Sequence, residues 1–207
     1  LPFLAEMEFR TLAKRAAAQF GTEAPEIKDT SPTVSNVPAL ETVSFDHSKY
    51  EQVENAMQLQ TWIDRIYARG HVAVDTETTG LDEMVVDLVG ISLCVEPGQA
   101  CYIPLAHKVA GGDDLFSDDA LAPGQMPFED ALRMLTPMLT DPSIIKIGQN
   151  MKYDMKIFAQ LGITVTPIDD TMLMSYSMHG GLHNHGMDAL SERYLNHTPL
   201  PIKPLLG

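Results

Sequence analysis

Hydrophobic spacing divides the chain into a helical start, an irregular stretch and a core of mixed elements. Residues 3 to 20 carry apolar positions at helical spacing, and we predict a helix there. Residues 21 to 48 are rich in Pro, Ser and Thr without periodicity, which is the composition of a linker. Between residues 50 and 70 the pattern becomes helical in its second half and stops at Gly70. The apolar face of this second helix carries Leu59, Trp62, Ile63 and Ile66.

The core begins with three strand-like runs, at residues 71 to 76, 85 to 95 and 99 to 105. The turn signal "EPGQ" joins the last two, and we expect these neighbouring strands to be antiparallel. Helices and strands alternate after them: a helix over 127 to 140, the short strand "IIKIGQ", a helix over 151 to 161, the strand candidate "GITVTPID", and helices in "DTMLMSYSM" and "GMDALSERYLN". The sequence therefore predicts an α/β fold with a mixed five-stranded sheet and flanking helices.

Two carboxylates end the first strand of this core, in the stretch "HVAVDTETTGL". Asp75 and Glu77 are separated by one residue, so strand alternation points both side chains to the same face. They must repel each other there unless a positive charge lies between them, and a divalent cation is the obvious candidate. A carboxylate that closes an apolar strand is costly to bury unless it is paired or bound to a metal. Two exposed carboxylates at a strand end remain the alternative.

A second polar motif, "GQNMKYD", places Asn150 and Asp154 four residues apart at the start of a helix. One helical turn separates them, so both lie on one face. This helix begins just after a short strand that could neighbour the first one. An acid in a first helical turn is also favoured by the helix dipole alone, so a surface position for Asp154 stays open.

Composition and charge narrow the function classes. The 207 residues are 44% hydrophobic and 20% charged, which is ordinary globular usage with room for one good-sized core. The net charge of −14 comes from 14 basic and 28 acidic residues, and it argues against binding nucleic acid by bulk electrostatics. Metal ions in the site, or a basic partner domain, could reconcile this charge with a nucleic-acid substrate.

The hydrophobic runs and the cysteines also indicate where in the cell the protein is found. No apolar run is long enough to cross a bilayer, and residues 1 to 20 lack the pattern of a signal peptide. We therefore expect a soluble cytoplasmic protein. Cys94 and Cys101 lie in strand-like sequence, and two thiols in a chain of this size form no disulfide framework. We expect both to be buried as small apolar residues.

Four stretches occur in an order and spacing that closely resemble the 3′-5′ proofreading exonuclease domain of bacterial DNA polymerase I: "VAVDTETTGL", "YIPLAH", "KIGQNMKYD" and "DTMLMSY…HGMDALSERYL". The likeness covers residues 60 to 207. "FLAEMEFRTLAKR" resembles the segment that follows the 5′ nuclease domain of the same enzymes. The resemblance implies an RNase H-like fold of the DEDD exonuclease type. It also implies three parts: a helix from the 5′ nuclease side (1–20), a linker (21–48) and a C-terminally incomplete 3′-5′ exonuclease domain (49–207).

The same resemblance implies two-metal-ion hydrolysis of the 3′-terminal phosphodiester of DNA, with Mg²⁺, or Mn²⁺ or Zn²⁺, as the cofactor. Asp75 would bridge both ions. Glu77 would bind the ion that orients the attacking water and reach the terminal 3′ hydroxyl, and Asp154 would hold the second ion. Expected partners are the 3′ end of single-stranded DNA and the polymerase and 5′ nuclease domains of the same chain. We expect a monomer that makes no membrane contact.

Substrate positions follow from the resemblance as well. Family positions that contact the last nucleotides match Leu81, Gln149, Asn150 and Tyr153. Leu81 would pack on the terminal base and Asn150 would hydrogen-bond the strand. A further family position, usually aromatic and wedged between the last two bases, matches Ile202, where an aliphatic side chain replaces the stacking ring. Packing in the core or a loop is the alternative for Leu81 and Ile202.

One part of the family pattern is missing. The family completes its site with Tyr-x-x-x-Asp on a later helix, and none of the six tyrosines here has Asp four residues later. The match stops at "PIKPLLG". We expect the 207 residues to be nearly inactive and to bind metal weakly. A chain extended through the next helix should degrade single-stranded DNA with Mg²⁺ or Mn²⁺.

Several alternatives remain at the level of sequence. His183 and Asp188 form His-x-x-x-x-Asp, the signature of a sister group of exonucleases in which His is the general base. The histidines of "HGGLHNHG", His179, His183 and His185, invite a zinc site, but no Cys lies nearby, and solvated loop histidines are the simpler interpretation. A non-catalytic module that positions a primer terminus and an RNA-trimming exonuclease of the ribonuclease D type are the other functional candidates.

Overall fold

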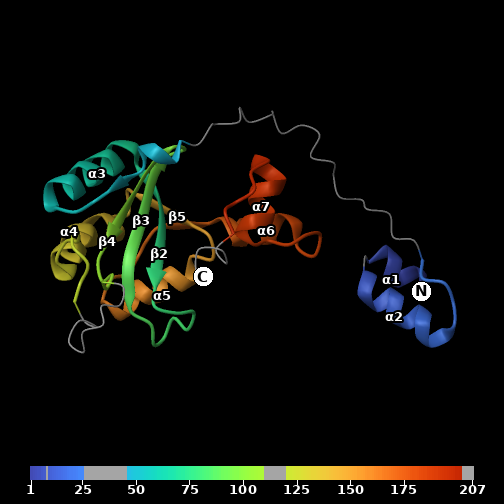
Figure 1. Cartoon of the computed structure of the whole chain (residues 1–207). Helices are drawn as coiled ribbons and strands as arrows, with labels where there is room; N and C mark the ends of the chain where they lie inside the picture. The colour runs from blue at the N-terminus through green and yellow to red at the C-terminus, as the bar shows by residue number, and fades with distance from the viewer. Residues whose placement is uncertain (8, 26–45, 110–119, 202–207) are drawn as a thin grey trace. The chain divides into compact units, whose positions relative to one another are not determined.

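The structure, a computed structural model, describes residues 1–7, 9–25, 46–109 and 120–201 (Figure 1). The chain divides into two units, residues 1–38 and residues 39–207, and each is described here by itself. Within the described ranges, no helix combines the length and the apolar character needed to cross a membrane.

The first unit contains two helices, α1 (Pro2–Glu6) and α2 (Arg10–Phe20), where the sequence predicts one. The break lies at Phe9, whose backbone is not helical (φ −75°, ψ 66°) and whose N–H donates to the carbonyl oxygen of Leu4 at 2.8 Å. Helix α2 buries two alanines and ends at Gly21 in the left-handed conformation. The prediction of a continuous helix over residues 3 to 20 is therefore wrong.

The second unit is built on a six-stranded mixed sheet with the strand order β1-β4-β3-β2-β5-β6. Its strands are β1 (Glu51–Gln52), β2 (His71–Thr78), β3 (Leu88–Glu96), β4 (Gln99–Pro104), β5 (Ile145–Gly148) and β6 (Ile168–Asp170). Strands β2, β3 and β4 are antiparallel neighbours, as predicted, whereas β5 and β6 join them in parallel. The mixed α/β fold is confirmed, with β2 between β3 and β5 (Figure 1).

The described part of this unit also contains the helices α3 (Ala56–Arg69), α4 (Phe128–Thr140), α5 (Lys152–Gln160), α6 (Thr171–His179) and α7 (Met187–Leu190). A 3₁₀ turn, His47–Lys49, precedes β1, and a π-helical turn, Ser191–Leu195, follows α7 where the sequence predicts one continuous helix. Helix α3 contacts α4, β2 and β3. It buries the predicted face of Leu59, Trp62, Ile63 and Ile66.

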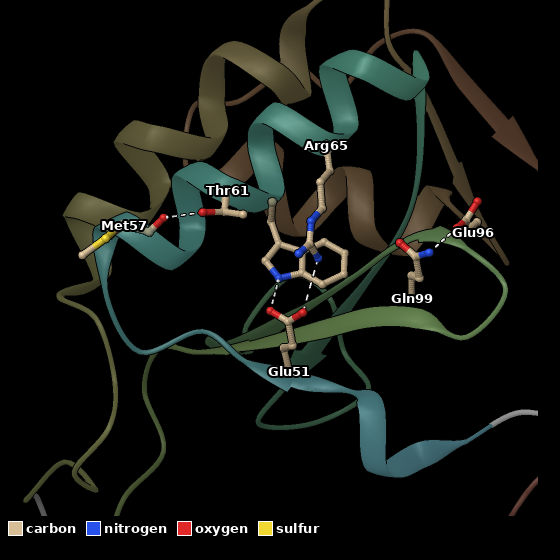
Figure 2. Close-up of polar contacts among 7 residues, drawn as sticks. Glu51, Met57, Thr61, Arg65, Glu96 and Gln99 are labelled. Atoms are coloured by element: carbon tan, nitrogen blue, oxygen red, sulfur yellow. Dashed lines mark hydrogen bonds and ion pairs between the residues drawn. The ribbon is translucent and has the colours of Figure 1, made fainter.

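The sheet has one strand more than predicted, because β1 is only two polar residues long and shows no hydrophobic pattern. It pairs in parallel with β4. The Glu51 carboxylate accepts hydrogen bonds from Trp62 Nε1 (3.1 Å) and Arg65 Nη1 (3.3 Å), which ties β1 to α3 (Figure 2). Of the strand predicted in "GITVTPID", only the end belongs to a strand, β6. Ile163 and Val165 are buried but lie outside any strand.

The two cysteines are free thiols on neighbouring strands. Cys101 is buried, as predicted, and burial together with the nearby charge of Glu51 raises its pKa to about 12. Cys94 is half-buried, and its Sγ donates to the carbonyl oxygen of Glu96 at 3.1 Å. Both residues therefore act as small side chains within the sheet rather than as reactive thiols.

A buried lysine joins the loops at the start of β5. Lys146 has no exposed surface, and its Nζ donates to carbonyl oxygens of Thr166 (2.5 Å), Ile144 (2.6 Å), Asp141 (2.9 Å) and, more weakly, Met138 (3.4 Å). Burial lowers the pKa of this amine, against the opposing charge of Asp141. The amine bonds buried carbonyl groups of Met138 and Ile144 and part-buried ones of Asp141 and Thr166, so it fixes the approach to β5.

Lys146→Met should destabilise the fold, because it keeps much of the side-chain volume but leaves these carbonyl groups without their donor. We expect the free energy of unfolding to fall by about 3 kcal/mol, measured by urea denaturation. Lys152→Met, at an exposed position on α5, is the matched control. Equal stability of the two variants would contradict a structural role for the buried amine.

Candidate active site

The second half of β2 extends beyond its parallel neighbour. Strand β2 pairs with β5 only from His71 to Ala73, whereas it stays paired with β3 as far as Thr78. Strand β5 ends at Gly148, where an added Cβ would collide with the Met151 side chain and lie 3.3 Å from the Val74 carbonyl oxygen. The chain therefore turns tightly beside β2 and enters α5, which contacts β2.

This arrangement brings Asp154 to the predicted carboxylate pair. Thr76, the residue between Asp75 and Glu77, donates to Asp154 Oδ1 from its backbone N–H (3.0 Å) and from its hydroxyl (2.6 Å). Asp154 is only 2% exposed, whereas Asp75 and Glu77 are exposed. Both hydrogen bonds end on Oδ1, so Oδ2 takes part in neither. The surface position that the sequence left open for Asp154 is excluded.

The charges of Asp154 and Glu77 both act on Asp75. Although Asp75 as a whole is exposed, partial burial of its carboxyl group raises its pKa to about 6, and the negative charges of Asp154 and Glu77 add to the effect. Burial also raises the pKa of Asp154, and the two hydrogen bonds from Thr76 oppose that shift. The site thus holds carboxylates that repel one another, which a cation would relieve.

The donor set fits a hard divalent cation, because all its ligand atoms are carboxylate oxygens. In the part of the chain that the structure describes, no three His, Cys, Asp or Glu side chains are already placed to hold one ion. Asp154 is fixed by Thr76, whereas Asp75 and Glu77 are exposed and free to turn toward an ion. Closing the site therefore requires side-chain rotation at the two exposed positions.

Two predicted substrate residues lie at the loop between β2 and β3. The Tyr153 hydroxyl donates to the carbonyl oxygen of Gly80 at 2.8 Å. The Thr78 hydroxyl lies 2.6 Å from the Tyr153 hydroxyl. Leu81, the next residue of the loop, is 92% exposed. Core packing for Leu81 is therefore excluded, and an apolar side chain is presented to solvent next to Tyr153.

The other predicted substrate residues differ in how far their side chains are already bonded within the protein. Gln149 Nε2 donates to the carbonyl oxygen of His185 (2.8 Å), and its Oε1 accepts from the Thr171 hydroxyl (2.5 Å). Both ends of the side-chain amide are therefore bonded to other parts of the protein. Asn150 is exposed and adopts a left-handed backbone (φ 59°), which Asn tolerates better than most residues. Ile202 lies outside the described residues.

The sequence analysis missed Asp170, a carboxylate that shapes the site from β6. Asp170 is 6% exposed and opposes Gly148 in the sheet. Its oxygens accept backbone hydrogen bonds from Met151 (2.8 Å), Met172 (2.9 Å), Asn150 (3.2 Å) and Leu173 (3.2 Å). One side chain thus caps α6 and holds the turn that leads to Asp154. The signal in the sequence was an Asp directly before a helical pattern.

The three histidines near α6 pack together rather than lying solvated in a loop. The ring of His183 lies 4.7 Å from that of His185 and 5.5 Å from that of His179. Nδ1 of His183 donates to the Asn184 carbonyl oxygen (2.8 Å), and Nδ1 of His185 bonds the Ser175 hydroxyl (2.9 Å). Among the described residues these histidines belong to no group of three ligands placed to hold a metal, so the zinc alternative gains no support.

Comparisons with known proteins agree with this geometry. A family model described as 3′-5′ exonuclease matches residues 50–204. DNA polymerase I of Rhizobium leguminosarum is 43% identical over an alignment of 178 positions, which covers 82% of this chain and 17% of that protein. Escherichia coli RNase D has a TM-score of 0.56 at 19% identity, covering 76% of this chain and 36% of that one. Brucella melitensis NrnC with bound Mg²⁺ has a TM-score of 0.50 at 23% identity, covering 73% of this chain and 62% of that one.

The fold is that of the RNase H-like exonucleases, with an Asp-x-Glu strand inside the sheet and an aspartate on the helix that follows β5. Within that class, the chain belongs to the 3′-5′ exonuclease family found in DNA polymerase I. It spans 17% and 16% of the length of the first two curated relatives that it matches.

Asp170→Ala should remove the acceptor of all four backbone N–H groups. We expect it to lower the free energy of unfolding by on the order of 3 kcal/mol, measured by chemical denaturation, and Asp170→Asn to restore part of this loss by keeping one acceptor oxygen. Asp169→Ala, at the adjacent position of the same edge strand, is the matched control. A loss for Asp170→Ala no greater than that of the control would contradict the capping role.

The pKa of His185 is lowered from its ordinary value of 6.5. Burial is the main cause, and the charges of His183 and His179 add to it. The folded state therefore binds fewer protons than the unfolded state, so stability falls as the pH drops from above 6.5 toward the lowered pKa. Tyr176 and Tyr194 also face this cluster. We expect His185→Asn to show a shallower loss of stability between pH 7 and about 5. An unchanged dependence of stability on pH would contradict the contribution assigned to His185.

Proposed function

We propose that the chain is a 3′-5′ exonuclease domain whose site serves to remove nucleotides from the 3′ end of single-stranded DNA by hydrolysis of the terminal phosphodiester, assisted by two divalent ions. The 207 residues contain no Tyr-x-x-x-Asp, so we expect these residues alone to be nearly inactive and to bind metal weakly. The observation that carries the proposal is the meeting of Asp154 with the Asp75 and Glu77 pair through Thr76, across 78 positions of sequence. Acids are costly to gather unless cations hold them, and the family matched here is a nuclease family.

The divalent ions would be held by Asp75, Glu77 and Asp154, with Mg²⁺ or Mn²⁺ favoured by the all-oxygen donor set. The Mg²⁺ named for the Brucella melitensis NrnC structure supports this choice of ion. When bound, such ions stabilise the negative charge that develops on the phosphate. They also place positive charge where DNA must approach a chain with a net charge of −14.

The chain's own residues would bind and orient the DNA. Thr76 holds Asp154 in one orientation, so the buried carboxylate needs no reorganisation when substrate arrives. Leu81 is exposed to meet the terminal base, and Asn150 is exposed to hydrogen-bond the strand. Tyr153 lies beside both the loop and Asp154. The amide of Gln149 bonds the carbonyl oxygen of His185, and Gln149 remains a predicted contact of the last nucleotides.

DNA is the favoured substrate because a relative at 43% identity is a DNA polymerase, whereas RNase D resembles the chain in fold at 19% identity. The presence of Asp75, Glu77 and Asp154 favours catalysis over a module that only positions DNA. We further propose that the chain works beside polymerase and 5′ nuclease domains, since its relatives named DNA polymerase I are several times longer than the matched region.

Asp75→Asn, Glu77→Gln and Asp154→Asn each remove one negative charge with little change of shape. We expect each to weaken Mn²⁺ binding by about tenfold or more, measured by the electron paramagnetic resonance of free Mn²⁺. Digestion of a 5′-labelled oligothymidylate at stoichiometric protein should fall by about a hundredfold or more in the same variants. An oligouridylate of equal length should be cut more slowly than the DNA.

Asp188→Asn is the matched control, because Asp188 is an exposed acid on α7 and the partner of His183 in the rival signature. We expect it to leave Mn²⁺ affinity and digestion unchanged. Loss of digestion in Asp188→Asn would favour the rival, and undiminished Mn²⁺ affinity in all three carboxylate variants would refute the proposed site.

A further inference from the structure

We propose that Lys156 and Gln160 are positioning residues that fix Leu81 relative to Asp154. This inference rests on the proposed function, in which Leu81 meets the terminal base. Tyr153, Lys156 and Gln160 follow the spacing i, i+3, i+7 and therefore share one face of α5. That face meets the loop between β2 and β3, while Asp154 on the same helix meets Thr76 of β2.

Helix α5 holds the loop at two points on either side of Leu81. On one side, the Tyr153 hydroxyl donates to the Gly80 carbonyl oxygen at 2.8 Å. On the other side, Lys156 Nζ forms an ion pair with Glu83 Oε1 at 2.5 Å, and the Gln160 side-chain amide donates to the Glu83 carbonyl oxygen. Leu81 and Asp82 lie exposed between these two attachments, and Leu81 is the apolar one of the two.

Further hydrogen bonds close the loop at its base. The N–H of Thr79 donates to the Asp87 carbonyl oxygen (3.0 Å), and the N–H of Asp87 donates to the Thr79 hydroxyl (3.0 Å). The N–H groups of Val85 and Val86 donate to the Asp82 carbonyl oxygen at 3.1 and 3.2 Å. The loop is therefore ordered through its own backbone, and α5 sets where its tip lies.

The exposure of Leu81 gives this arrangement its functional meaning. A leucine that is 92% exposed gains nothing from the protein core, so fixing it on both sides has no benefit for packing. It does remove conformational freedom that DNA binding would otherwise have to restrict. Because α5 carries both Asp154 and the attachments, the helix sets the distance between the carboxylate and the apolar contact for the base.

A double-mutant cycle with the whole 207-residue chain tests this inference. The variants are Leu81→Ala, Lys156→Met and the double variant, and the readout is the affinity for a 5′-fluorescein oligothymidylate in Mn²⁺, measured by anisotropy. We expect Leu81→Ala to weaken binding about tenfold and Lys156→Met about threefold. In the Leu81→Ala background, Lys156→Met should have no further effect.

Two controls separate positioning from charge. Lys152→Met removes an exposed charge from the same helix, so any loss of affinity it causes should be equal with and without Leu81. Lys156→Arg should restore binding, because it can still pair with Glu83. Amide hydrogen exchange at Val85 and Val86 should become faster in Lys156→Met and return toward the original rate in Lys156→Arg.

The outcomes distinguish this inference from the proposed function. If Lys156→Met weakens binding equally in both backgrounds, Lys156 acts through its own charge and the positioning role is refuted, while the nuclease proposal stands. If Leu81→Ala leaves affinity unchanged, Leu81 is not a substrate contact and both the positioning role and that part of the proposed function fail. Loss of affinity in Lys156→Arg equal to that in Lys156→Met would also overturn the inference.

Discussion

The pair of hydrogen bonds from Thr76 to Asp154 is the interaction on which the rest of the site depends. It joins β2 to α5 by a single carboxylate oxygen and places a buried acid beside the two exposed ones. The contact exists because β5 stops at Gly148, which leaves the second half of β2 open to the helix that follows. Asp170 then holds the turn between β5 and α5 through the N–H groups of Asn150 and Met151.

Charge is the reason why we propose a functional site at these acids rather than a stable surface. A carboxylate as buried as Asp154 is kept in place by Thr76, but its charge and that of Glu77 still contribute to raising the pKa of Asp75. A fold gains nothing from such repulsion by itself, and strongly shifted acids are typical of active sites. The family match supplies an independent reason to expect cations here, since nucleases of this fold act on phosphate esters.

Strong local patterns made much of the fold predictable. The apolar face of Leu59, Trp62, Ile63 and Ile66 predicted α3, and the antiparallel order of β2, β3 and β4 followed from short runs joined by turns. The pair Asp75 and Glu77 was visible because strand alternation fixes the direction of side chains. The two-residue strand β1 was not predictable, because its position depends on pairing with β4 and on contacts of Glu51 with Trp62 and Arg65 in the helix that follows.

The residues that hold the site together were hidden for the same reason. Thr76 and Lys146 look unremarkable in sequence, and Asp170 shows only as the residue before a helical pattern; their contacts with separate segments arise from the tertiary fold. Likewise, the attachment of Glu83 to Lys156 spans 73 positions. Periodicity reports local structure, whereas these contacts arise from the tertiary fold.

A crystal structure of the chain soaked with Mn²⁺, with the anomalous signal used to locate the ion, tests the central claim most directly. The account predicts anomalous density between the carboxylates of Asp75, Glu77 and Asp154, with Thr76 still bonded to Asp154. Clear Mn²⁺ density elsewhere together with none between these three side chains, at a concentration that saturates binding in solution, would contradict it.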